Sequence, residues 1–126
     1  MHRSQLAGFI IDCETDDLDA AATFWGQALG CNLSHSDDPQ DEAYVELETD
    51  PGEVHVEVQR VDHPSRLHMD IETDDIEAEV VRLENLGAKR VAQVKRWWVM
   101  EAPTGHRFCV VTPQRANFSE TANEWS

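Results

Sequence analysis

Apolar residues recur at helical spacing in two segments of the chain, and these segments predict two amphipathic helices. The segments span residues 16–30 and 74–87. Their apolar stripes consist of Leu18, Ala22, Trp25 and Leu29 in the first and Ile76, Val80, Leu83 and Leu86 in the second. Acidic residues open both segments, where they can cap a helix, and a glycine closes both, where a left-handed residue is favoured. The two segments therefore look like copies of one unit.

Short apolar or alternating runs surround both helices and predict strands. They cover residues 6–13, 43–47 and 54–58 around the first helix, and residues 67–72, 90–94, 97–100 and 107–111 around the second. Turn residues separate them at Asp50-Pro51-Gly52 and at Ala102-Pro103-Thr104-Gly105. The sequence thus predicts the order strand, helix and a small group of strands, given twice.

Alternation within two of these strands places polar side chains on one face. The polar positions are His55 and Glu57 in residues 54–58, and His68, Asp70 and Glu72 in residues 67–72. If the helices cover the apolar face, histidines and carboxylates from separate strands gather on the opposite face. This mixture favours a functional face over the alternative, a merely solvated one, which is common in antiparallel sheets.

Composition narrows the classes of partner. A chain of 126 residues fits a single domain, and its net charge of −15 repels phosphate backbones and anionic membranes. No apolar run approaches the ~20 residues of a membrane helix, and no secretory signal is evident at the start. Three widely spaced cysteines, Cys13, Cys31 and Cys109, predict reduced thiols and a cytoplasmic location.

Four segments resemble the vicinal oxygen chelate superfamily, and within it the glyoxalase-like branch related to bleomycin-resistance proteins. They are FWGQALG at residues 24–30, HMDIETDDIEA at 68–78, LGA at 86–88 and WVMEAPTGHRFCV at 98–110. The resemblance implies an α+β fold of two βαβββ modules, whose strands form a cup-shaped, curved mixed sheet with the helices on its outer face. It places a single domain over residues 1–113, with modules at about 6–60 and 66–113. The tail, residues 114–126, either frays or docks along a sheet edge.

The resemblance also implies positions for metal ligands, and this chain departs from two of them. The first-strand position falls near Gly8, which has no side chain, and the last-strand position falls at Cys109. His68 matches the histidine of the family, and Glu57 is the nearer match to its carboxylate. His68 and Glu57 are thus candidate ligands for a divalent metal such as Fe, Mn, Ni or Zn. Cys109 is either a thiolate ligand or a small buried packing residue.

The remaining candidates have a functional and a structural interpretation each. His55 and His68 bind a ligand or pair with neighbouring carboxylates. Arg107 binds an anionic group or forms an internal salt bridge. Trp97 and Trp98 point to opposite faces of one strand, so one packs beneath a helix and the other lines the cup. The sequence does not decide which, and Trp98 is the one named as a ligand-binding candidate. Glu57 and Asp70 are candidate catalytic residues for proton transfer.

Three functions follow from these features. The first is a cytoplasmic glyoxalase/bleomycin-resistance-like protein that binds a small organic molecule in the cup, with catalysis left open. The second is a metal-dependent lyase, isomerase, thiol transferase or dioxygenase of the same superfamily, against which Gly8 and Cys109 argue. The third is an interaction subunit, because the resemblance implies a homodimer.

Overall fold

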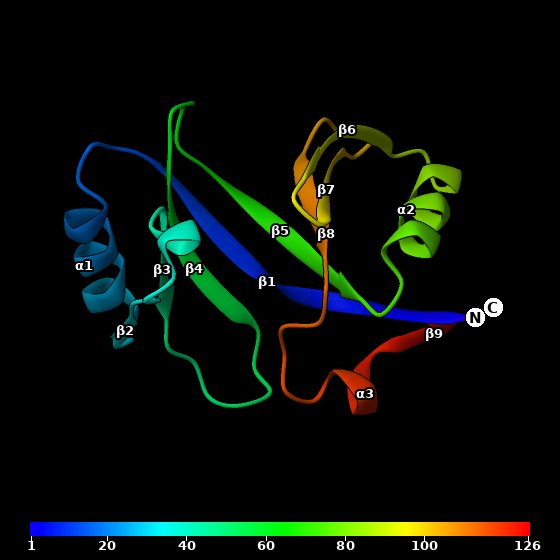
Figure 1. Cartoon of the computed structure of the whole chain (residues 1–126), viewed down its shortest axis with the longest axis horizontal. Coiled ribbons are helices and arrows are strands. Elements are labelled where there is room, and N and C mark those ends of the chain that lie inside the picture. Colours follow the sequence, from blue (N-terminus) through cyan, green and yellow to red (C-terminus); the bar gives the residue numbers. More distant parts are fainter. The chain divides into compact units, whose positions relative to one another are not determined.

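The computed structural model describes residues 1–126 and contains two successive βαβββ modules (Figure 1). The first module consists of β1 (His2–Glu14), α1 (Leu18–Leu29), β2 (Leu33–Ser34), β3 (Tyr44–Leu47) and β4 (His55–Val61), with a 3-10 helix η1 (Pro39–Asp41) before β3. The second consists of β5 (Arg66–Thr73), α2 (Ile76–Asn85), β6 (Lys89–Val94), β7 (Trp97–Glu101) and β8 (Arg107–Val111). The chain ends with α3 (Phe118–Thr121) and β9 (Asn123–Trp125). The predicted α+β class and module order are confirmed.

The chain divides into two compact units, which are described separately. The α1 unit comprises residues 9–67, and the α2 unit comprises residues 1–8 and 68–126. None of the helices is both long and apolar enough to cross a membrane.

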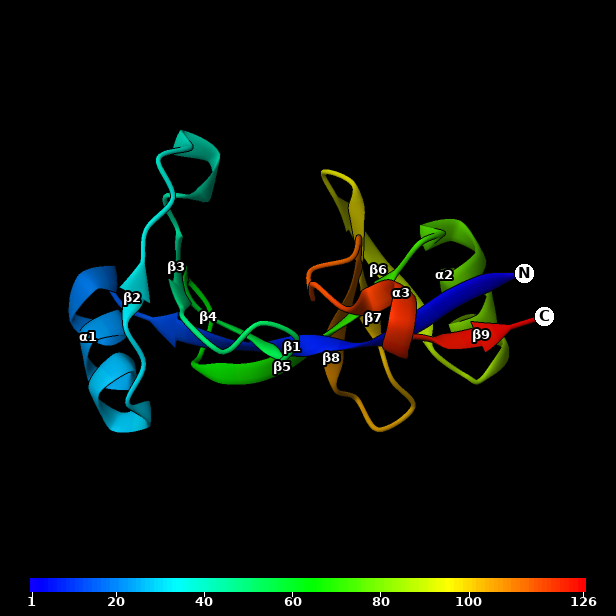
Figure 2. The same ribbon diagram turned by 90° about the horizontal axis from the view of Figure 1, so that it is seen from below.

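In the α1 unit, helix α1 packs on β3 and β4 (Figures 1 and 2). The helix begins after Asp17, whose carboxylate accepts a hydrogen bond from the backbone N–H of Ala20 at 3.0 Å. It ends at Gly30, whose φ of 71° is the left-handed conformation that glycine adopts without strain. The buried core beneath it consists of Leu18, Ala22, Val45, Leu47 and Val58. The cap, the glycine and the first three positions of the apolar stripe follow the sequence pattern, whereas Leu29 in the last turn is 54% exposed.

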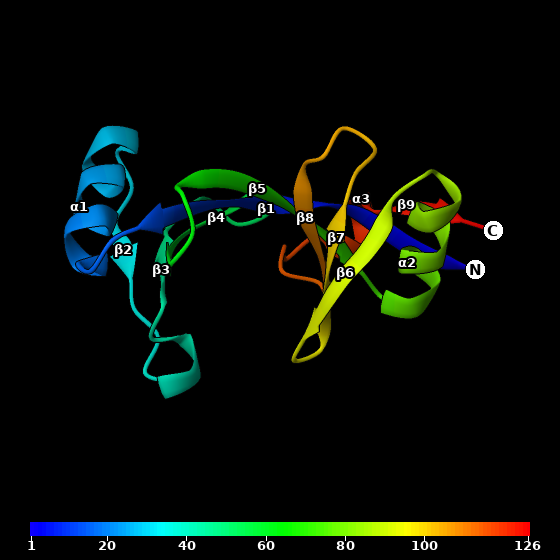
Figure 3. The same ribbon diagram turned by 90° about the horizontal axis from the view of Figure 1, so that it is seen from above.

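In the α2 unit, helix α2 packs on β6, β7 and β8 (Figure 3). Asp75 caps it by accepting a hydrogen bond from Ala78 N at 3.1 Å. The strands have the order β5-β8-β7-β6; β5 and β8 are parallel and the other pairs antiparallel, so this sheet is mixed as predicted. Its core consists of Val80, Leu83, Met100, Phe108 and Val110.

The C-terminal tail docks along the first strand rather than fraying. Strand β9 pairs antiparallel with β1, with His2 opposite Trp125. Trp125 Nε1 donates a hydrogen bond to Ser4 Oγ at 2.8 Å, and Phe118 of α3 is buried. The sequence left this choice open, and the pairing decides it.

A buried carboxylate on α2 joins both ends of the chain. Glu79 has no exposed surface and accepts hydrogen bonds from Arg82 at 2.8 Å, while His2 Nε2 lies 2.7 Å from its Oε1. The Arg82 guanidinium in turn lies 4.0 Å from the ring centroid of Trp125. We call His2, Glu79, Arg82 and Trp125 the terminal cluster.

The terminal cluster predicts a loss of stability in acid. Burial alone would raise the pKa of Glu79, but hydrogen bonds from Arg82, His2 and Ser4 outweigh it and hold the pKa below its ordinary value. A lowered pKa means that the folded state favours the ionised carboxylate. The ionised Glu79 therefore adds its full share to the free energy of unfolding above the ordinary glutamate pKa of about 4.3. This share is lost as the pH falls through the lower pKa of the folded state. Urea unfolding at pH 7 and at decreasing pH should show this decline in the wild type and a smaller one in Glu79→Gln. Equal declines would contradict it.

Candidate metal centre

The mixed sheet of the α2 unit has one face covered by α2 and one polar face. Asp70 lies opposite Cys109 in the β5–β8 register, and Cys109 lies opposite Val99 in the β8–β7 register. Residues two positions away along each strand share that face. The polar face therefore carries His68, Asp70, Trp97, Val99, Glu101, Arg107 and Cys109. His68 and Arg107 lie on the same face, as the sequence pattern predicts.

His68, Asp70 and Cys109 form a compact group of possible metal ligands, which we call the His-Asp-Cys cluster. One ligand atom from each of the three lies within 4.8 Å of the other two, and His68 Nε2 is 3.4 Å from Asp70 Oδ1. The His68 and Asp70 side chains are only 12% and 15% exposed. Asp70 Oδ1 is fully buried and has no hydrogen-bond partner, so the contact with His68 lacks hydrogen-bond geometry.

The His-Asp-Cys cluster fits a divalent cation. A buried carboxylate oxygen without a hydrogen bond is unfavourable unless a charge compensates it. Imidazole, carboxylate and thiolate are all zinc ligands, and two nitrogen or oxygen ligands of tetrahedral zinc lie roughly 3.3 Å apart, close to the His68–Asp70 distance. Three protein ligands leave one coordination position open, as in catalytic zinc sites. The thiol and the imidazole favour zinc over magnesium or calcium.

Arg107 lies beside the cluster with part of its guanidinium free. Its Nε donates a hydrogen bond to Glu101 Oε1 at 3.1 Å, and its side chain is 38% exposed. The two Nη groups make no hydrogen bond in the structure. The side chain therefore forms an internal salt bridge and still presents donors that an anionic group can use.

His55 and Glu57 form a separate pair in the α1 unit. His55 Nε2 lies 2.6 Å from Glu57 Oε1, and His55 Nδ1 lies 3.8 Å from Glu46 Oε1. In the β3–β4 register Glu46 is directly opposite Glu57, so the imidazole lies between two carboxylates. The structure thus groups Glu57 with His55, while His68 is grouped with Asp70 and Cys109 in the α2 unit.

The structure corrects the role expected for Trp98. The two tryptophans do point to opposite faces of β7, but it is Trp98 that packs against the core beneath α2, with the Arg90 guanidinium 5.0 Å from its ring centroid. Trp98 is therefore a core residue, and Trp97 is the tryptophan on the polar face. Periodicity within one strand shows that two side chains diverge, but not which of them meets the helix.

Cys109 is the residue whose role the sequence left open, and the structure places it among the candidate ligands. The signal in the sequence is that Cys109 lies two residues beyond Arg107 and so shares its face of the strand. The other cysteines offer no second centre: all three are free, and burial together with the neighbouring Asp12 raises the pKa of Cys13, which opposes a reactive thiolate.

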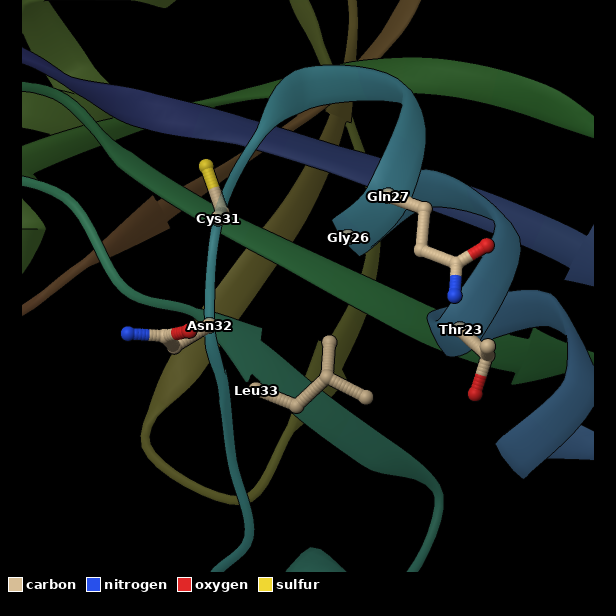
Figure 4. Close-up of a pocket in the computed structure, with 6 residues that line it drawn as sticks. All are labelled: Thr23, Gly26, Gln27, Cys31, Asn32 and Leu33. Carbon is tan, nitrogen blue, oxygen red and sulfur yellow. The ribbon is translucent and has the colours of Figure 1, made fainter.

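A shallow hollow in the α1 unit is not a strong ligand site. It has a volume of about 240 Å³ and is lined by Thr23, Gly26, Gln27, Cys31, Asn32 and Leu33 (Figure 4). Small-molecule pockets usually enclose about 300–1,000 Å³. A side chain at Gly26 would fill the hollow further, because a Cβ there would lie 2.8 Å from Leu33 Cδ2. Gly26 therefore permits the close approach of α1 and β2 beside this hollow.

Comparison with known proteins identifies the family. The family model described as glyoxalase-like domain matches residues 8–111, so the chain belongs to this family, within the vicinal oxygen chelate superfamily. No curated protein sequence matches the chain.

Solved structures share the fold at low sequence identity. A hypothetical protein from Bacillus halodurans C-125 is 13% identical, with a TM-score of 0.62 over 90% of this chain and 97% of that one. The Streptomyces coelicolor methylmalonyl-CoA epimerase in complex with 2-nitronate-propionyl-CoA is 12% identical, with a TM-score of 0.61 over 87% of this chain and 98% of that one. Another methylmalonyl-CoA epimerase is 16% identical, with a TM-score of 0.58 over 86% and 95%. At these identities the comparisons show the fold alone.

Proposed function

We propose that the protein binds a divalent metal, zinc by its donor set, through His68, Asp70 and Cys109, and a small oxygen-containing organic molecule at the open coordination position. The observation that carries this proposal is the buried Asp70 Oδ1, which has no hydrogen-bond partner and lies 3.4 Å from an imidazole nitrogen. No neighbouring donor satisfies this oxygen, whereas a cation would.

The residues of the polar face have distinct roles in this function. A bound divalent ion would supply Lewis-acid polarisation of a ligand oxygen. His68, Asp70 and Cys109 hold the ion, and the low exposure of His68 and Asp70 limits water at that position. The free Nη groups of Arg107 orient an anionic group of the ligand. His55 and Glu57 lie apart from this face, in the α1 unit, and are a separate pair of candidate ligand-binding and catalytic residues. Their 2.6 Å contact would let the imidazole hold or release a proton at Glu57 Oε1.

Metal titration tests the proposal. Purified, metal-free protein should take up one equivalent of zinc, and cobalt in its place should give the thiolate-to-cobalt absorption band that reports Cys109. Loss of one ligand in His68→Ala or Cys109→Ser should weaken zinc binding by at least about tenfold. His63→Ala and Cys31→Ser, which alter exposed or partly exposed residues outside the cluster, are the matched controls. No stoichiometric uptake, or equal losses in the controls, would refute the metal site.

A metal-free binding protein is the second candidate, favoured by the free donors of Arg107. In that case the protein sequesters an anionic small molecule without catalysis. Binding of a carboxylate such as oxalate to metal-free protein, lost in Arg107→Ala and kept in His68→Ala, would distinguish it from the metal-dependent binding of the first proposal.

Two further properties belong to this proposal. We place the protein in the cytoplasm because its three cysteines are free. The homodimer implied by the family resemblance remains a prediction, which light scattering of the purified protein checks.

A further inference from the structure

The β6–β7 hairpin carries a charge opposite to that of the rest of the protein. The hairpin, residues 89–101, contains four of the ten Lys and Arg residues and a single acidic residue, Glu101, at the end of β7, in a chain with 25 acidic residues and a net charge of −15. The positive residues are Lys89, Arg90, Lys95 and Arg96. In an otherwise repulsive field, this hairpin is where an anion meets a favourable local potential.

Lys95 and Arg96 at the hairpin tip have no carboxylate partner. Arg90, at the other end of β6, is held by Glu77 at 2.8 Å and by Glu84 at 3.2 Å. Lys95 and Arg96 are exposed and form no ion pair in the structure. Figure 3 shows the tip between β6 and β7 extending away from α2, the helix that supplies the carboxylates for Arg90. The two charges at the tip are therefore available.

The turn conformation disfavours the residue that occupies it. Val94 pairs with Trp97, so Lys95 and Arg96 form a two-residue hairpin loop. Lys95 has a φ of 54° and is the only non-glycine residue with positive φ. Glycine, asparagine and aspartate are favoured at such positions, and a lysine there is strained. A strained residue that supplies an unpaired charge suggests a function for that charge.

Trp97 adds an aromatic surface next to these charges. The Lys95 ammonium lies 5.7 Å from the Trp97 ring centroid, and Trp97 lies on the polar face. An indole beside two adjacent cations is suited to a ligand that has several negative charges and a planar group.

We propose that the β6–β7 hairpin tip is an anion-binding element in which Lys95 and Arg96 bind a phosphate or pyrophosphate group and Trp97 contacts a planar part of the same small molecule. Two adjacent cations match a group with more than one negative charge better than a single carboxylate. This proposal goes beyond the metal site, because the tip shares no residue with the His-Asp-Cys cluster.

Calorimetry with two probes tests the proposal on metal-free protein at low ionic strength. Pyrophosphate should bind, and ADP should bind and also quench tryptophan fluorescence. Affinity for both should fall as salt is added. The double variant Lys95→Gly/Arg96→Ser should bind pyrophosphate at least about tenfold more weakly, which corresponds to the loss of about two charge-assisted contacts. Because metal is absent, the result is independent of whether the cluster binds zinc.

Two variants make this test decisive. Arg60→Ser removes one exposed cation from β4 in the α1 unit and should change the affinity less than twofold (roughly the noise of a surface charge change). Lys95→Gly alone places glycine at a positive φ, so it should raise the melting temperature by roughly 2–4 °C while weakening binding. A double variant that binds as well as the wild type, or an Arg60→Ser variant that loses as much affinity, would overturn the proposal.

Discussion

Replacing Glu79 with alanine is expected to lower the free energy of unfolding by about 3–5 kcal/mol, the usual effect of removing one partner from a buried ion pair. The Glu79 side chain has no exposed surface, and Arg82 donates to both of its oxygens, from Nε to Oε1 and from Nη2 to Oε2, at 2.8 Å each. Without the carboxylate, Arg82 and His2 lose their common acceptor. Urea unfolding followed by tryptophan fluorescence measures the change.

Two control variants separate the buried pair from a general effect of charge. Glu79→Gln keeps the size of the side chain and one acceptor, so its loss should be smaller than that of alanine. Glu84→Ala removes a more exposed carboxylate near Arg90 and should cost less than about 1 kcal/mol, as surface ion pairs do. A Glu79→Ala variant as stable as Glu84→Ala would show that the terminal cluster contributes little to folding.

Local patterns were sufficient to predict the helices and their modules. The caps at Asp17 and Asp75 depend only on residues within one helical turn. The glycine at Gly30 and the apolar stripe of each helix are equally local. Alternation over five or six residues also assigned the faces of β4 and β5. These features are encoded by neighbours in sequence, so one chain is enough to find them.

The candidate site was only partly predictable because it depends on which strands are neighbours. Alternation within β5 places His68 and Asp70 on the same face of that strand, and alternation within β8 does the same for Arg107 and Cys109. Nothing in the sequence pattern states that β5 and β8 are adjacent and parallel with Asp70 opposite Cys109, which brings the thiol to the carboxylate. For the same reason the sequence does not decide which of Trp97 and Trp98 lies on the polar face of β7.

Buried acidic residues are a second feature that periodicity misses. Glu72 alternates with apolar neighbours and was expected on the polar face, yet it has no exposed surface. Its burial comes from the C-terminal tail, whose docking the sequence left open. Polar burial of this kind depends on contacts between distant segments, and hydropathy along one strand does not show them.

Glu72→Ala should consequently destabilise the protein by about 3 kcal/mol and release the tail, since buried donors that lose their acceptor cost about 1–3 kcal/mol each. Glu72 Oε1 accepts hydrogen bonds from the backbone N–H groups of Gln114 and Arg115 at 2.6 and 2.9 Å. Its Oε2 accepts one from Gln5 Nε2 at 2.6 Å. Hydrogen exchange should show faster exchange of the Gln114 and Arg115 amides, and urea unfolding should show the loss of stability.

Glu72→Gln provides the matched comparison because it keeps the oxygen that the tail needs. Its remaining carbonyl can accept both backbone hydrogen bonds, and its amide can donate to Gln5 if the Gln5 amide reverses. That reversal is compatible with the neighbour of Gln5, because the Thr121 hydroxyl, now 2.7 Å from Gln5 Oε1, can accept as well as donate. Glutamine should therefore preserve slow exchange in the tail, whereas alanine should not. If the tail amides of both variants exchange equally fast, the charge of Glu72, and not its acceptor geometry, holds the tail on β1 and β5.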